Sequence, residues 1–296
     1  MSKKTLFLNL WPVEIVLFVY FLVTFILMFT YRTQLPDILS HATTRGLLLA
    51  AYLLIIYWQN RNRQVNTYYV LRLFFPMLLL PFLYKETDYL NNLFFSENLD
   101  PFFAGTEYAL FHTQPSLLFS EKFHARWFSE LMYFGYFSYY LLIVFIPLII
   151  YLKKGARSAE RVIFIIINSF LIYYLVFILI PVAGPQFYFT DLMNTLPEGY
   201  IFGPIMKLIQ MNGEGQTGAF PSSHVSICLI LLCLSFTEMK RFLPVVLTVS
   251  VLLILSTVYL KAHYVIDVLG AFLTTPLVYV LSSGLYNRII RYNFST

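Results

Sequence analysis

A series of apolar runs, most of them about as long as a bilayer is thick, constrains this chain more than any other feature. The runs predict membrane-spanning helices at residues 11–30, 46–58, 71–84, 129–152, 162–181, 225–236, 242–259 and 263–286. The first run is long and lacks a small-residue cleavage site, so we expect an uncleaved span rather than a signal peptide. The 296 residues are 59% hydrophobic and only 12% charged, which excludes a soluble domain. We expect an all-α fold, a polytopic membrane helical bundle with about eight transmembrane helices.

The runs are not evenly spaced along the chain. Residues 1–84 hold the first three spans, and Pro76 and Pro81 are expected to kink the third. Residues 85–128 contain apolar pieces too short to span, so we expect outer interfacial helices before the fourth span. Residues 129–287 form the expected catalytic helical core. Because no linker or repeat interrupts the pattern, residues 1–296 are predicted to form a single integral membrane domain.

The basic residues lie mainly in short loops, and this distribution predicts the topology. With the amino terminus inside, the inner segments hold 13 of the 20 basic residues and the longer outer segments hold 7. The inner ones are Lys3, Lys4, Arg61, Arg63, Arg72, Lys153, Lys154, Arg157, Arg161, Lys240, Arg241, Arg288 and Arg291. The positive-inside rule then places both termini in the cytoplasm. All five histidines fall on the outer side, facing the periplasm, the exterior or a lumen. Topology also explains the net charge of +5, so no nucleic-acid partner is expected.

Polar residues of chemical interest gather at both ends of one apolar hairpin, within residues 218–270. Pro221, Ser222 and Ser223 suit the start of a helix, and His224 follows them directly. The free N–H groups at such a helix start, together with the helix dipole, bind anions such as phosphate. Taken alone, these residues are more often a simple helix cap. Because a hairpin returns the chain to the same side, its two mouths can share one site.

At the second mouth, His263 and Asp267 are four residues apart and share one face of a helix. A carboxylate there can hold one imidazole nitrogen protonated and leave the other free to attack. Such a pair is more often an interfacial hydrogen bond than a catalytic pair. Combined with His224 and the helix start, it indicates phosphoryl transfer through a phosphohistidine.

These residues resemble the second and third signature motifs of the type 2 phosphatidic acid phosphatase superfamily. The second motif matches residues 220–224, and the third, SRxxxxxHxxxD, matches Ser256, His263 and Asp267. Together with the upstream sequence 181–185, the sequences of these motifs are most similar to the inositol phosphorylceramide synthase branch, the inositolphosphotransferases. The resemblance implies that His263 is the nucleophile, Asp267 its partner and His224 the proton donor to the leaving group. It also implies that Ser222 and Ser223 bind phosphate.

The chain departs from the family at its basic residues. The first family motif, KxxxxxxRP, has no counterpart, since the nearest candidate is Pro185-Gln186, and Thr257 replaces the arginine of the third motif. Charge-assisted hydrogen bonds to phosphate contribute about 1.5–3 kcal/mol each, so their loss suits a diester better than a monoester. Cations from elsewhere in the chain could substitute: Lys207, Lys261, Arg126 or Arg45. The expected substrate-binding residues are therefore Ser222, Ser223, Ser256, Lys261, Lys207 and Gln186.

The sequence accordingly predicts a metal-independent membrane enzyme that acts on a phospholipid or sphingolipid. Transfer of a phosphoinositol-like headgroup to a lipid alcohol such as ceramide is favoured, and a lipid phosphate phosphatase is the alternative. An inactive lipid-binding or transport scaffold is a further alternative function. No cofactor is expected, although zinc bound by His224, His263 and Asp267 stays open. The two cysteines, Cys228 and Cys233, are expected to pack in the sixth span. The oligomeric state is left open.

Overall fold

The computed structural model describes residues 10–189 and 196–295, and within them every regular element is a helix. The long helices are α1 (Pro12–Thr30), α2 (Ile38–Arg61), α3 (Asn66–Tyr89), α6 (Arg126–Lys154), α7 (Ala156–Leu179), α11 (Leu243–Tyr259) and α12 (Val265–Ser295). Shorter ones are α4 (Asp100–Phe111), α5 (Pro115–Lys122), α8 (Pro185–Tyr188), α9 (Phe202–Gly213), α10 (Ser223–Glu238) and a 3₁₀ turn, η2 (Lys240–Phe242). This confirms the all-α prediction.

Seven of these helical segments are long and apolar enough to cross a bilayer, so the protein is an integral multi-pass membrane protein. The predicted sixth span forms α10, which has only 16 residues. At 1.5 Å per residue it is about 24 Å long, shorter than the roughly 30 Å hydrocarbon core. In place of the roughly eight spans expected, the described residues thus contain seven long helices and one short apolar helix. Within the described residues of 85–128, α4 and α5 are too short to span, as predicted.

Several spans are longer than the apolar runs that predicted them, because polar side chains continue the helices and find partners inside the bundle. Arg72, at the start of α3, donates to both carboxylate oxygens of Glu14 at 2.6 and 2.7 Å, and both side chains are fully buried. At the other end of α3, Glu86 accepts hydrogen bonds from Arg45 and from His41. Glu14 is therefore a buried ion-pair partner inside the bundle.

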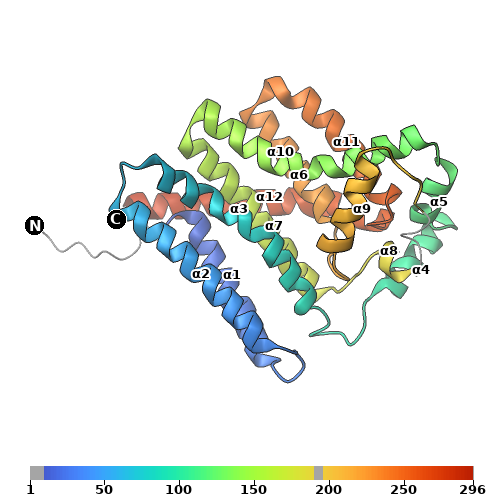
Figure 1. The fold of residues 1–296 in the computed structure, drawn as a ribbon, viewed down its shortest axis with the longest axis horizontal. Helices are drawn as coiled ribbons and strands as arrows, with labels where there is room; N and C mark the ends of the chain where they lie inside the picture. Colours follow the sequence, from blue (N-terminus) through green and yellow to red (C-terminus); the bar gives the residue numbers. More distant parts are fainter. Residues whose placement is uncertain (1–9, 190–195, 296) are drawn as a thin grey trace, which may run out of the picture.

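Helix α7 lies at the centre of the bundle and packs against α1, α3, α6, α10 and α12 (Figure 1). About 78% of its most apolar stretch is buried, the largest share of any spanning helix among the described residues. Its inward positions are almost all aliphatic or aromatic, from Val162 to Ile178. Burial on all sides requires a helix that is hydrophobic all round. Helix α7 therefore fixes the positions of the helices that carry the polar residues of interest.

Helices α10 and α11 form the predicted hairpin, and three loops meet at its open end beside the start of α12. Backbone hydrogen bonds join these loops: Ala219 N–H donates to Val182 O at 3.0 Å, and Gln186 N–H donates to Lys261 O at 2.9 Å. A third, from Ser222 N–H to Asp267 O at 3.1 Å, ties the second-motif loop to α12. The segments that carry the second and third motifs and the upstream sequence 181–185 are thus held as one unit.

Candidate active site

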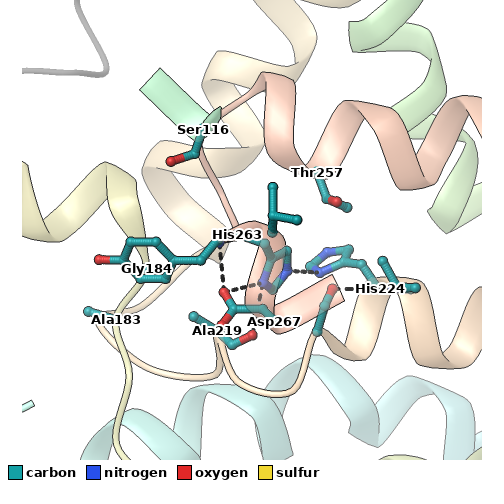
Figure 2. A network of polar contacts seen from close by, with 12 residues as sticks. Ser116, Ala183, Gly184, Ala219, His224, Thr257, His263 and Asp267 are labelled. Atoms are coloured by element: carbon teal, nitrogen blue, oxygen red, sulfur yellow. Dashed lines mark hydrogen bonds and ion pairs between the residues drawn. The ribbon is translucent and has the colours of Figure 1, made fainter. Parts of the chain in front are cut away.

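His263 lies in the turn between α11 and α12, where its ring is buried and its orientation is fixed. Its Nδ1 is 2.9 Å from the carbonyl oxygen of Ala219, which can only accept, so Nδ1 carries the proton. The Nε2 lone pair therefore points the other way, toward His224 (Figure 2). Burial lowers the pKa of His263 from 6.5 to about 4. At neutral pH the ring is uncharged and its Nε2 is available for attack.

His224 lies in the first turn of α10, on the side of the His263 ring that faces away from Ala219. Its Nδ1 is 3.2 Å from Nε2 of His263. The rings of Tyr136 and Tyr139 pack against its imidazole, with ring centroids 4.9 and 4.4 Å away. These aromatic contacts hold His224 facing the nitrogen of His263 that is free to react. The structure thus brings together the two histidines that the sequence placed at separate ends of the hairpin.

Asp267 lies behind His263, in the first turn of α12. Its Oδ2 is 3.6 Å from Nδ1 of His263 and accepts the backbone N–H of Tyr264 at 2.8 Å. The direct partner of Nδ1 is the Ala219 carbonyl, so Asp267 contacts the ring at longer range than the sequence suggested. When it is ionised, Asp267 favours a positive imidazole at this distance.

The start of α10 has the predicted cap, although the helix begins after Pro221 rather than at it. The hydroxyl of Ser222 accepts the N–H of Val225 at 3.3 Å. Within the described residues, the N–H groups of Ser223 and His224 have no hydrogen-bond acceptor. These are the groups that a phosphate at a helix N-terminus would use.

A recess at this end of the bundle is lined by residues of all three loops and by α3 and α6. They are Tyr84, Tyr136, Ala183, Gln186, Glu214, Gly215, Thr217, Gly218, Ala219, Ser223, His224, Ala262 and His263. Its cavity volume is about 20 Å³, enough for a water molecule, so a phosphate requires the lining to open. Of the predicted substrate-binding residues, only Gln186 and Ser223 line it.

The other predicted substrate-binding residues lie elsewhere. Ser256 is buried in α11 and donates to Leu253 O at 2.7 Å. Lys261 is buried in the turn before His263, where burial lowers its pKa and the nearby Glu121 raises it, and it does not line the recess. Lys207 lies on α9, also outside the lining. Thr257, at the position of the family arginine, supports the turn through its carbonyl, which accepts the N–H groups of Ala262 and His263.

The two arginines considered as replacement cations are engaged away from the recess. Arg45 donates to Glu86 and to Thr24. Arg126 donates to the carbonyl of Gly199 and its guanidinium lies 4.4 Å from the centre of the Tyr200 ring. Among the described residues, the recess is therefore lined by no lysine or arginine.

Two acids on α4 that the sequence did not indicate fix the loops around His263. Asp100 accepts the N–H groups of Ala183 and Gly184, both at 2.8 Å, and the hydroxyl of Tyr264 at 3.1 Å. Glu107, two turns from Asp100 on the same face of α4, accepts the N–H of Val265 at 2.5 Å. Both acids are almost completely buried. The signal available in the sequence was their spacing of seven residues, which puts both on one face of a short helix.

Glu214, directly after α9, is the third acid that sequence reasoning missed. Its carboxylate accepts the hydroxyl of Tyr136 at 2.7 Å and the side-chain amide of Gln186. Gln210 in turn donates to the side-chain oxygen of Gln186 at 3.2 Å. A carboxylate thus occupies a recess in which the family resemblance predicts cations. The sequence shows only that Glu214 lies in a glycine-rich stretch, which does not reveal its neighbours.

The geometry also bears on the zinc alternative. Across residues 10–189 and 196–295, no group of three or more His, Cys, Asp or Glu side chains could hold a metal ion. His224 faces Nε2 of His263, whereas Asp267 lies on the Nδ1 side, so the three cannot bind one ion together.

The chain is similar to known proteins over the region that contains this site. The family described as "PAP2 superfamily" matches residues 92–281. A protein described as "PA-phosphatase related-family protein", from Dictyostelium discoideum, is 24% identical over 199 residues. That alignment covers 60% of this chain but only 36% of the relative, so the chain matches about a third of the relative's length. No solved structure gave a significant match.

Proposed function

Because the chain belongs to the PAP2 superfamily, we propose that it is a membrane enzyme that transfers a lipid phosphoryl group through a phosphohistidine at His263. The observation that carries this proposal is the pairing of His263 Nε2 with His224 Nδ1 at 3.2 Å. A buried, neutral nucleophile faces a second imidazole that can deliver a proton, and both line one recess. Family membership supports lipid phosphatase or phosphotransferase chemistry.

In the first half-reaction, Nε2 of His263 attacks phosphorus in line. A nitrogen–phosphorus bond forms, the bond from phosphorus to the lipid oxygen breaks, and His224 gives its proton to that oxygen. The imidazolium that forms at His263 keeps its Nδ1 proton on the carbonyl of Ala219 and is stabilised by the charge of Asp267. The free N–H groups at the start of α10 offset charge that develops on the phosphate.

In the second half-reaction, an acceptor oxygen attacks the phosphorus and releases His263, while the proton of the acceptor passes to His224. We propose that the acceptor is a lipid alcohol such as ceramide and that the transferred group is a phosphate-containing headgroup, phosphoinositol being the candidate suggested by the sequence. The absence of lysine and arginine from the described lining supports a singly charged phosphodiester over a doubly charged monoester. Hydrolysis by water, which would make the protein a lipid phosphatase, is the second candidate and shares the first half-reaction.

The test uses purified protein in mixed micelles with a chelator present. One arm offers a lipid phosphomonoester, and the other offers a phosphoinositol lipid with and without ceramide. His263→Ala is assayed beside His124→Ala, a control in which an exposed histidine is removed from the segment before α6. A new headgroup-bearing sphingolipid that requires both ceramide and His263 supports the transferase. Phosphate release that requires His263 supports the phosphatase, and activity that survives His263→Ala refutes the mechanism.

We further propose that both termini face the cytoplasm and that the recess faces outward. The excess of basic residues in the predicted inner loops supports this orientation. Single cysteines introduced at His124 and at Arg157, in a variant without Cys228 and Cys233, should react with an impermeant thiol reagent in intact cells only at position 124. Labelling at position 157 alone would reverse the topology.

A further inference from the structure

The recess beside His263 contains a carboxylate that the proposed reaction leaves without a role. Glu214 is held by hydrogen bonds from Tyr136 on α6 and Gln186 on α8, and Gln186 is itself held by Gln210 on α9. Three helices therefore orient this one carboxylate. An acid that was merely solvated would not need such support.

The charge balance of the recess is unusual for a site that binds phosphate. No lysine or arginine is among its described lining residues, and His263 is neutral at physiological pH because burial lowers its pKa to about 4. Glu214 lies close enough to His263 to raise that pKa in part. A second anion, the phosphate, must enter beside it. Like charges in a partly buried site repel strongly, so a compensating positive charge is required.

Besides the partial positive charge of the free N–H groups at the start of α10, the ligand itself can supply that charge. Tyr84 and Tyr136 line the recess together with Glu214. Aromatic rings beside a carboxylate form the type of site that binds ammonium groups, both through the ring faces and through the opposite charge. Both oxygens of Glu214 already accept a hydrogen bond, so a ligand that approaches as an undirected charge fits better than a diol, which needs two directed acceptors.

We propose that Glu214 is a specificity-determining residue that binds the cationic part of the donor headgroup. The preferred donor is then a zwitterionic phosphodiester lipid, of the phosphoethanolamine or phosphocholine class, rather than a phosphoinositol lipid. This inference rests on the proposed function for its chemistry, because the same attack by His263 on phosphorus transfers the ammonium-bearing headgroup. It replaces the headgroup suggested by the sequence with one that matches the charge of the recess.

The kinetic test compares donors with identical acyl chains and phosphocholine, phosphoethanolamine or phosphoinositol headgroups. We expect wild-type kcat/KM to be at least about tenfold higher for the two zwitterionic donors, with most of the difference in KM. Glu214→Gln keeps the shape and one of the two accepted hydrogen bonds but removes the charge, so it should abolish this preference. Glu214→Asp keeps the charge and should retain it. Glu97→Gln removes an exposed acid outside the recess and should change neither kcat/KM nor the preference between donors.

A binding test separates this inference from the proposed function. It uses the His263→Ala protein, which has no nucleophile, and measures equilibrium binding of glycerophosphocholine and glycerophosphoinositol with and without Glu214→Gln. Tighter binding of glycerophosphocholine that is lost in Glu214→Gln supports the inference even if no transfer is ever detected. Equal binding of the two probes, or a preference that survives Glu214→Gln in a protein that remains monodisperse, overturns it. Transfer that depends on His263 but ignores the headgroup would refute the inference and leave the proposed function intact.

Discussion

Asp100→Asn tests whether α4 holds the loops that position His263. The carboxylate accepts two backbone N–H groups and one hydroxyl, and it is buried. An amide can accept with only one oxygen, so its NH₂ group faces the N–H of Ala183 or Gly184 and leaves that donor unsatisfied. An unsatisfied buried donor costs about 1–3 kcal/mol, and the remaining bonds lose their charge assistance. Burial raises the pKa of Asp100, so removing the charge returns part of this cost.

We expect a net loss of about 2 kcal/mol, which in a protein of this size lowers Tm by roughly 4–8 °C. Because Gly184 and Tyr264 flank His263, kcat should also fall at least about tenfold with a smaller change in KM. The measurements are thermal unfolding in detergent micelles and initial rates with the best donor. The control is Glu97→Gln, which removes an exposed acid three residues before Asp100 and should leave both quantities unchanged. If Asp100→Asn behaves like this control, α4 does not position the catalytic loops.

Three further predictions concern backbone, charge and metal. Gly184 has φ +99°, and a Cβ there would lie 2.7 Å from the carbonyl oxygen of Ala262. Gly184→Ala should therefore lower the free energy of unfolding by at least about 2 kcal/mol and remove most of the activity. As a control, Gly105→Ala on α4, where a Cβ meets nothing within 4 Å, should be neutral or stabilising in the same unfolding assay. Burial raises the pKa of Glu107 from 4.5 to about 7, so between these pH values the folded protein binds a proton that the unfolded chain has lost. The protein therefore loses stability as pH rises from about 4.5 to 7. Glu107→Gln should flatten this part of a Tm–pH profile, and an unchanged slope would contradict the raised pKa of Glu107. Dialysis against EDTA should leave the initial rate unchanged, whereas loss of activity that zinc restores would favour the metal alternative.

The two histidines that we propose as the catalytic pair were predictable as neighbours because their signal is local. The four-residue spacing of His263 and Asp267, and a helix start before His224, are both visible in the sequence. The hairpin that joins them follows from one pair of apolar runs. Long apolar runs likewise predicted the bundle, since burial of backbone polar groups in lipid leaves few alternatives to helices.

What the sequence did not predict depends on contacts between residues far apart in the chain. Asp100 bonds to residues 183 and 184, and Tyr136 bonds to Glu214, and no periodicity encodes such pairs. The start of α2 and the end of α3 were misplaced because Arg45 and Glu86 look like loop residues until they are known to pair with each other. The cations expected to replace the missing arginines are not in the described lining, and Glu214 lies there instead.

The most direct test of the proposed mechanism is the capture of a covalent intermediate on His263. Purified protein is mixed with a donor lipid labelled on its phosphate, without acceptor, and quenched in base, in which phosphohistidine is stable. We expect label bound to the peptide that contains His263. This label should be released by acid, absent in His263→Ala, present in His124→Ala and discharged by added lipid alcohol. Label on another residue, or full turnover by His263→Ala, would contradict a phosphohistidine at this site.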